Sequence, residues 1–149
     1  MSLWLRTPSL EQLNAATAGT MMRPLGIVFT EVGPDFLRGA MPVDERTRQP
    51  YGLLHGGASV TLAETLGSTG AALCTDSERF LCVGQEINAN HLRSAKSGRV
   101  IGTARPVHIG GRSHVWGIEI VNEAGALICI SRLTMAIIER PPAPAAPAA

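Results

Sequence analysis

The 149-residue sequence contains few aromatic residues, although apolar residues are common. Phe, Trp and Tyr together make up 4% of the chain, whereas apolar residues as a whole make up 45%. The hydrophobic core must therefore be built mainly from Val, Ile, Leu and Ala, in a chain long enough to bury about 68–70% of its unfolded surface. We expect one folded domain over residues 1–140 and a disordered tail over 141–149, where only Pro and Ala occur.

The sequence also lacks an excess of charge of either sign and lacks a long apolar run. Its 13 basic and 12 acidic residues give a formal net charge of +1, which argues against a nucleic acid as partner. There is no run of about 18 apolar residues to cross a membrane. The first residues, MSLWLRTPSLEQ, lack the apolar core of a signal peptide. These absences predict a cytoplasmic protein without a membrane partner.

Cysteine is scarce, and several well-known sequence motifs are absent. Cys74, Cys82 and Cys129 are odd in number and show no C-x-x-C spacing, which favours free thiols in a reducing compartment. No second His or Cys stands at metal-ligand spacing from His55, so we expect neither a metal nor a cofactor. The phosphate-binding, dinucleotide-binding and serine-hydrolase motifs are missing, which leaves nucleotide hydrolysis and serine-nucleophile chemistry unsupported.

The order of elements predicts an α+β fold. Ser9 and Gln12 form a capping-box pattern that predicts a short helix over residues 9–18. Residues 58–74 are typical of a longer helix, rich in small residues that allow close approach of other chain segments. Six strand-like runs are expected at 25–32, 36–43, 80–92, 99–108, 113–122 and 126–139. One antiparallel sheet covered by a single long central helix follows from this order.

The long predicted helix carries one ionisable acid, Glu64, among apolar and small residues. A carboxylate in such surroundings is costly to desolvate and needs either a partner or a chemical role. The structural interpretation is an acid that is paired to an Arg or points to water. The functional interpretation is a general base or nucleophile, with Ser68 one turn further along the same face.

Just before this helix lie residues able to bind and polarise a carbonyl group. His55, Gly56 and Gly57 stand where the loop enters the helix. The glycine pair is explained equally well by an N-terminal turn, or by free backbone N–H groups that face an oxyanion and are assisted by the helix dipole. His55 could be a core residue or a hydrogen-bond donor. Gln49 alone would indicate nothing, and it becomes a candidate carbonyl-binding residue only together with these neighbours.

Helix geometry separates these two groups within one chain. Eight residues of helix, from Gly56 to Glu64, span about 12 Å. A side chain that leans towards the helix N-terminus recovers only part of that distance. A carbonyl held at Gly56 would therefore lie more naturally beside Glu64 of the partner subunit, and we expect a site shared across a two-fold dimer.

Two further segments offer donors for phosphate groups. Residues 88–94 end a predicted strand and include His91 and Arg93, and residues 108–113 form a predicted loop with Gly110, Arg112 and Ser113. Each segment alone is more typical of a solvated turn. Together they provide cationic and N–H donors suited to a phosphorylated ligand.

Three segments carry a resemblance to a known family. They are GLLHGGASVTLAETLGS at 52–68, EINANHLRSAKSGRV at 86–100 and SRLTMAI at 131–137. They resemble hotdog-fold acyl-CoA thioesterases of the 4-hydroxybenzoyl-CoA thioesterase type, in the branch with the 1,4-dihydroxy-2-naphthoyl-CoA and enterobactin-proofreading thioesterases. The resemblance implies hydrolysis of an acyl-CoA, aromatic in type, by a homotetramer built from dimers whose sheets join edge to edge.

The resemblance also implies a role for each candidate residue. Glu64 matches the carboxylate that attacks the thioester or activates water, and Ser68 matches a residue that helps to place the water or the intermediate. Gln49, His55 and the Gly56 N–H match the groups that orient and polarise the carbonyl. The remaining matches fall where such enzymes hold CoA: His91, Arg93, Gly110, Arg112 and Ser113.

Two other functions remain open from the sequence. A hotdog hydratase or dehydratase acting on acyl-CoA or acyl carrier protein also uses a His and an acid, although the His-Gly-Gly motif favours hydrolysis. A non-catalytic acyl-CoA-binding module would need neither Glu64 nor Gln49. Acyl carrier protein thioesters are an alternative substrate for the thioesterase itself.

Overall fold

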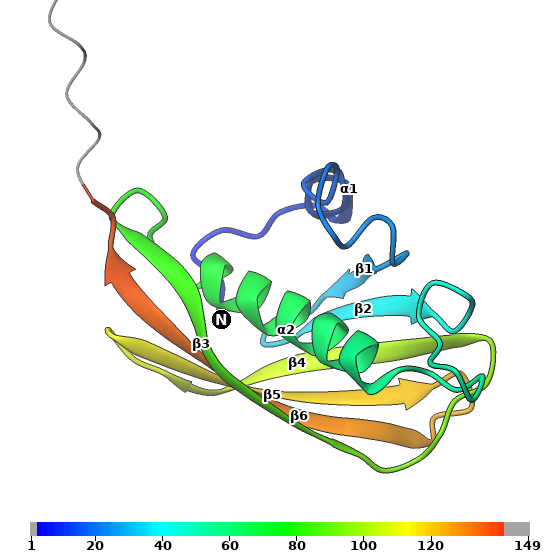
Figure 1. Ribbon diagram of the computed structural model, residues 1–149. Helices are drawn as coiled ribbons and strands as arrows, with labels where there is room; N and C mark the ends of the chain where they lie inside the picture. The colour runs from blue at the N-terminus through cyan, green and yellow to red at the C-terminus, as the bar shows by residue number, and fades with distance from the viewer. Residues whose placement is uncertain (1–2, 142–149) are drawn as a thin grey trace, which may run out of the picture.

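The computed structural model describes residues 3–141 as an antiparallel sheet wrapped around one long helix (Figure 1). The central helix α2 is Gly56–Leu73, and the short helix α1 is Leu10–Ala15. The strands are β1 (Val28–Val32), β2 (Leu37–Pro42), β3 (Phe80–His91), β4 (Arg99–Ile109), β5 (Ser113–Asn122) and β6 (Leu127–Glu139). The strand order is β1-β2-β4-β5-β6-β3, with every neighbouring pair antiparallel. The predicted hotdog architecture is confirmed.

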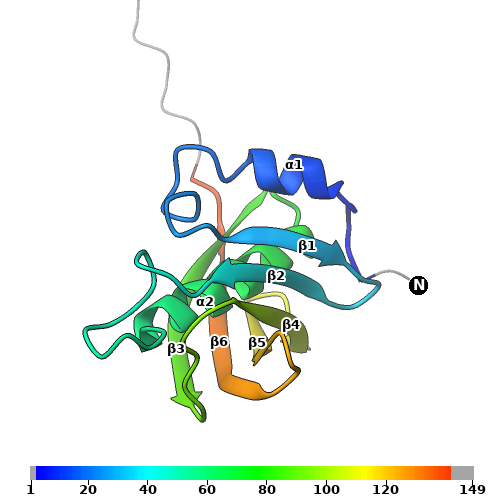
Figure 2. The same ribbon diagram turned by 90° about the vertical axis from the view of Figure 1, so that its right-hand side faces the viewer.

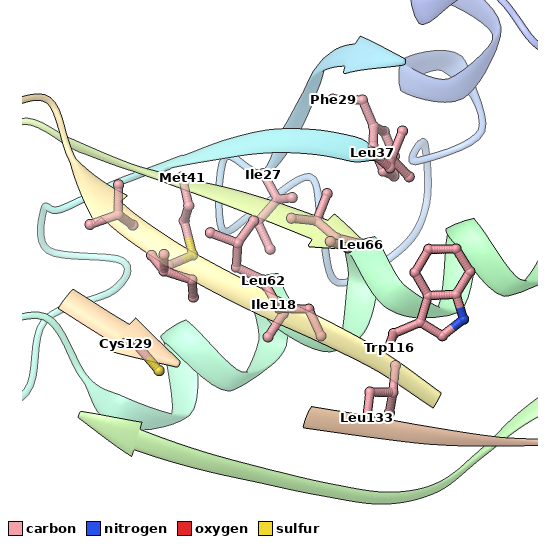
Figure 3. Packing of buried hydrophobic residues seen from close by; sticks show 14 of the residues in the cluster. Ile27, Phe29, Leu37, Met41, Leu62, Leu66, Trp116, Ile118, Cys129 and Leu133 are labelled. Atoms are coloured by element: carbon pink, nitrogen blue, oxygen red, sulfur yellow. The ribbon is translucent and has the colours of Figure 1, made fainter. Parts of the chain in front are cut away.

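The inner face of the sheet packs on α2 and forms the core (Figure 3). Leu62 and Leu66 of the helix are fully buried, and each such side chain contributes about 1.5–3 kcal/mol of transfer free energy. The small residues that the sequence places in this helix are needed for close contact. A Cβ on Gly67 would lie 2.6 Å from Leu133 Cδ2, and one on Gly70 would lie 2.8 Å from the Trp116 ring.

The N-terminal helix is shorter than the sequence predicts. Its capping box is present, with the Ser9 hydroxyl accepting from the Gln12 N–H and the Gln12 side chain accepting from the Ser9 N–H. The helix nevertheless ends at Ala15, because the backbone N–H groups of Thr17 and Ala18 bond carbonyls three residues back rather than four, and Gly19 then turns the chain with a positive φ of 73°. Figure 2 shows α1 beside β1, at the edge of the sheet opposite β3.

Other element boundaries differ by only a few residues from those expected. The first strand begins at Val28 rather than residue 25, because Gly26 turns the chain with a positive φ of 69°. The central helix begins at Gly56, two residues earlier than the expected 58, because the His55 side chain caps it there. The expected disordered tail lies outside the described residues, apart from Pro141. Within residues 3–141, no helix is long and apolar enough to cross a membrane.

Candidate active site

His55 caps the N-terminus of α2 and is held in one tautomer. Its backbone is extended, and its Nδ1 atom accepts a hydrogen bond from the Gly57 N–H at 2.8 Å. This cap satisfies a backbone donor of the first helical turn. Because Nδ1 accepts, the neutral imidazole carries its proton on Nε2. The exposed His55 ring therefore offers an N–H donor next to the helix N-terminus.

The Gly56 N–H is a second donor at this helix end. The neighbouring amides are occupied, since Ala58 and Ser59 N–H both bond the His55 carbonyl and Gly57 N–H bonds the His55 ring. Among residues 3–141, Gly56 N–H has no hydrogen-bond partner. A free N–H at the positive end of an 18-residue helix is suited to stabilise a developing oxyanion.

Gln49 adds an amide donor whose orientation is fixed by its own loop. Its backbone N–H donates to the Leu53 carbonyl, and its carbonyl accepts from Gly52. The side-chain Oε1 accepts from the Tyr51 N–H. The amide oxygen is thereby engaged, and the Nε2 hydrogens remain free to donate to a ligand carbonyl.

Gln49 and Gly56 line one pocket together with two of the predicted CoA-binding residues. The pocket has a volume of about 300 Å³ and includes His91 and Arg93. The His91 ring rests on Gly56, so that a Cβ added to this glycine would lie 2.7 Å from His91 Nε2. Arg93 is anchored by a 3.0 Å hydrogen bond to the Leu127 carbonyl. The remaining lining residues are Leu53, Leu54, Ser59, Leu92, Ser94 and Ile128.

Glu64 lies in a different pocket, with a volume of about 340 Å³, lined by α2 and the turns before β1. The side chain is half-buried, and its carboxylate has no hydrogen bond or ion pair to any residue in the described part of the chain. Its Oε1 atom instead rests against the β3 backbone at Gly84, where an added Cβ would approach to 2.6 Å. The other lining residues are Thr20, Met21, Met22, Val60, Thr61, Thr65, Ser68 and Thr69.

Ser68 accompanies Glu64 in this second pocket. Its hydroxyl donates to the Met135 Sδ atom at 3.6 Å, and a thioether is a weak acceptor. A water or an oxyanion could therefore take over this donor at little cost. Within one chain, the structure thus brings Glu64 and Ser68 together but separates both of them from the pocket that holds Gln49 and Gly56.

The two predicted phosphate-binding segments also lie apart within one chain. Ser113 pairs with Ala136 of β6, whereas His91 pairs with Cys129 near the other end of that strand. Ala136 lies seven positions after Cys129, which is about 24 Å along an antiparallel strand. Gly110, Arg112 and Ser113 therefore lie at the sheet end nearer Gly84, and a joint role with His91 and Arg93 stays a prediction that needs a second subunit.

A β-bulge in β3 is a feature of the site that the sequence patterns did not reveal. Gly84 pairs with Met135 and Glu86 with Thr134, so that Gln85 is an extra residue in the strand. The extra residue shifts the strand's alternation. Cys82 packs against the core before the bulge, and the odd-numbered Ile87 and Ala89 do so after it. That change of phase between positions 82 and 87 was the signal that could have revealed it.

His114 is a buried histidine beside the Gly110 loop. Its side chain is 2% exposed, and its Nδ1 atom is buried without a hydrogen-bond partner. Burial and, secondly, the neighbouring His108 lower the pKa of His114 below 6.5, against a hydrogen bond to the Gly110 backbone that raises it. Folding therefore favours the neutral ring of His114.

This lowered pKa predicts that acid destabilises the protein through His114. Below about pH 6.5 the unfolded chain binds a proton at His114, whereas the folded chain does not bind one until its lowered pKa is reached. Over this range the free energy of unfolding falls by up to about 1.4 kcal/mol per pH unit. Urea unfolding at pH 7.5 and 5.0 should show this fall in the wild type and a smaller fall in His114→Gln. The exposed His108→Gln serves as control and should keep most of the fall. Equal falls in wild type and His114→Gln would contradict the prediction.

The described residues contain no group of three or more His, Cys, Asp or Glu side chains that could hold a metal ion. The arrangement consists of carbonyl-binding donors at a helix N-terminus and an unpaired carboxylate two turns further along. Such groups can polarise an acyl carbonyl and deliver a nucleophile to it.

Comparison with known proteins identifies the family. The thioesterase superfamily matches residues 51–129. The 1,4-dihydroxy-2-naphthoyl-CoA hydrolase of Escherichia coli is 55% identical over 136 residues, covering 91% of this chain and 99% of that protein. The proofreading thioesterase EntH of Cronobacter sakazakii is 50% identical, covering 91% and 98%.

Solved structures give the same result. The crystal structure of a mutant of thioesterase PA1618 from Pseudomonas aeruginosa has a TM-score of 0.92 and 51% identity, and covers 93% of this chain and 100% of that one. Thioesterase HI1161 from Haemophilus influenzae has a TM-score of 0.89 and 46% identity, with 92% and 95% covered. The fold, the family match over residues 51–129 and these relatives together show that the chain belongs to the thioesterase superfamily and is a thioesterase-family enzyme.

Proposed function

We propose that the protein hydrolyses the thioester bond of an acyl-CoA with an aromatic acyl group, releasing the free acid and CoA. The observation that carries this proposal is the Glu64 carboxylate, half-buried and unpaired within residues 3–141, at the wall of a pocket of about 340 Å³. A carboxylate left without a partner is available as a base or nucleophile. The name of the E. coli relative supports an aromatic acyl-CoA substrate and its hydrolysis, and the name of the Cronobacter relative supports thioester hydrolysis.

The proposed site is shared by two subunits. Strand β3 is an edge of the sheet, and its 12 residues are open to pairing on one side. If two copies pair β3 antiparallel about a two-fold axis near Ile87 and Asn88, Gly84 falls opposite the partner's His91. The Glu64 pocket of one subunit then adjoins the Gly56 pocket of the other. We expect such dimers to assemble further into a homotetramer.

The reaction follows from the donors at the helix N-terminus. The thioester carbonyl oxygen accepts from Gly56 N–H, from the Gln49 amide and from His55 Nε2–H, which leaves the carbonyl carbon electron-poor. The partner's Glu64 then either attacks this carbon or removes a proton from a water molecule that attacks it. Both routes place negative charge on the oxygen that these donors surround.

Collapse of the tetrahedral species breaks the carbon–sulfur bond and releases the CoA thiolate. A thiol has a pKa of about 8.5, so the leaving group needs no strong general acid. In the direct-attack route, water then hydrolyses the acyl–Glu64 anhydride. In this proposal Ser68 holds the water or the intermediate once its hydroxyl leaves Met135.

The same pairing brings together the segments proposed to bind CoA. His91 and Arg93 line the Gly56 pocket, and an antiparallel pairing of β3 places them at the same level along the sheet as the partner's Gly110, Arg112 and Ser113. The long nucleotide portion of CoA can cross the two strands between them. Cations and backbone N–H groups in these segments suit its phosphates.

The substrate assignment is tested by measuring free thiol released from hydroxynaphthoyl-, benzoyl-, phenylacetyl- and decanoyl-CoA and from an acyl carrier protein thioester. We expect hydrolysis of the aromatic CoA esters with kcat/KM at least about tenfold above that for decanoyl-CoA, a difference of about 1.4 kcal/mol in the barrier. No release from any of them would overturn the proposed reaction. Faster decanoyl-CoA hydrolysis would overturn the aromatic preference alone, and hydration of an enoyl thioester without thiol release would favour the hydratase.

A further inference from the structure

The Glu64 carboxylate lies against strand β3 and makes no hydrogen bond to any residue among 3–141. No described residue donates to it, yet its Oε1 atom lies against the backbone of β3 at Gly84. A Cβ at Gly84 would stand 2.6 Å from this oxygen and 3.8 Å from the carboxyl carbon. Contacts below 3.0 Å are essentially never seen for a real Cβ, so any side chain at this position must displace the carboxylate.

The β3 bulge explains why a glycine backbone is presented there. Because of the extra residue Gln85, the even-numbered Gly84 before the bulge and the odd-numbered His91 after it lie on the same face of the strand. Gly84 contacts Glu64 of α2, and the His91 side chain contacts Gly56 at the N-terminus of α2. Gly84 is not among the residues with positive φ, so its backbone conformation suits alanine as well. The absence of a side chain at Gly84 is therefore required by Glu64 and not by the strand.

We propose that Gly84 is a positioning residue for thioester hydrolysis: because it has no side chain, the Glu64 carboxylate can lie against the β3 backbone in its catalytic position. The proposal rests on the catalytic role of Glu64 proposed above. In this proposal Gly84 acts through the Glu64 oxygen that it contacts. Misplacement of a reacting group by about 1 Å can cost about 10²-fold in rate, and relief of a 2.6 Å contact requires a displacement approaching that size.

The test compares Gly84→Ala in two backgrounds. In the wild type we expect kcat to fall about 10- to 100-fold while KM stays within about threefold, because the change affects placement of the carboxylate and not binding. Glu64→Asp is less active by itself, but its shorter side chain does not reach Gly84. In that background Gly84→Ala should lower kcat by less than about twofold, a non-additivity that marks a shared contact.

Gly117→Ala is the matched control for adding a methyl group to a strand. A Cβ there meets only Val107 Cγ2, at 3.4 Å, on the neighbouring strand β4. This variant should keep wild-type kcat. Urea midpoints are measured for every variant. Destabilisation by Gly84→Ala that disappears in the Glu64→Asp background supports the proposal, and destabilisation that persists there shows that the glycine serves the strand and overturns it.

Three other outcomes overturn the proposal while leaving the enzyme's function intact. They are an unchanged kcat in Gly84→Ala, an equal fall in kcat in both backgrounds, and a rise in KM with kcat unchanged. Each presupposes an active wild type that needs Glu64. If the wild type releases no thiol, or Glu64→Gln is fully active, the proposed function itself has failed.

Discussion

Replacement of Glu64 by Gln is expected to lower kcat for aromatic acyl-CoA hydrolysis at least about 10²-fold, with KM within about threefold of the wild-type value. Gln keeps the size of the side chain and its place against Gly84, but it can neither accept a proton from water nor attack a carbonyl. The carboxylate makes no hydrogen bond or ion pair within the described chain, so its removal should leave folding nearly unchanged. Steady-state kinetics together with urea unfolding separate these two effects.

The control for this variant is Glu119→Gln, which neutralises an exposed acid on β5 in the wall of a different pocket. It should retain wild-type kcat. A Glu64→Gln enzyme with more than about a tenth of wild-type kcat would place the carboxylate outside the range of a general base or nucleophile. The proposed reaction would then be wrong, whatever the fold.

Much of the fold was predictable because its causes are local. The capping box at Ser9, the strand periodicity and the uninterrupted helical run around Glu64 each depend on neighbours a few residues apart. The strand ends differ where a turn residue intervenes, as Gly26 does before β1. The order of strands in the sheet did not follow from these patterns, because it depends on contacts between distant segments.

For the site, the identity of the candidate residues was predictable from the sequence, but the hydrogen bonds that their side chains make were not. The sequence marked Gln49, His55 and Glu64, but it did not show that His55 is tied to Gly57 or that the Gln49 amide oxygen is engaged by Tyr51. These hydrogen bonds decide which atoms are left to donate. They depend on the loop conformation, for which a single sequence carries no periodic signal.

The bulge in β3 shows the same limit in another form. A strand over residues 80–92 was expected, and β3 is Phe80–His91. The extra residue Gln85 reverses which face each later side chain occupies. Only this reversal allows one strand to support Glu64 through Gly84 and also to place His91 against Gly56. A regular strand would have turned one of these two residues away from the helix.

The second large effect concerns the proposal that each site is built from two subunits. Gln49→Ala and Glu64→Gln should each be nearly inactive alone. In a mixed dimer of the two variants, one site carries both defects and the other combines an intact Gln49 with the partner's intact Glu64. Random pairing makes about half of all dimers mixed, so the mixture should recover about a quarter of wild-type activity.

A matched control places both substitutions in the same chain. When that double variant is paired at random with wild-type chains, each site of a mixed dimer has one defect, and only wild-type dimers are active. Shared sites then give about a quarter of full activity, whereas sites contained within one chain give about half. Shared sites therefore predict more activity than sites within one chain in the first mixture, and less activity in the second.

The most direct test of the shared catalytic site is thus the thiol-release rate after Gln49→Ala and Glu64→Gln chains are co-expressed in equal amounts. We predict a rise from about 1% or less for each variant alone, through loss of the base or of an oxyanion donor, to about 25% of wild-type activity in the mixture. A mixture that stays as inactive as its components, from chains that demonstrably form mixed dimers, would contradict the shared site.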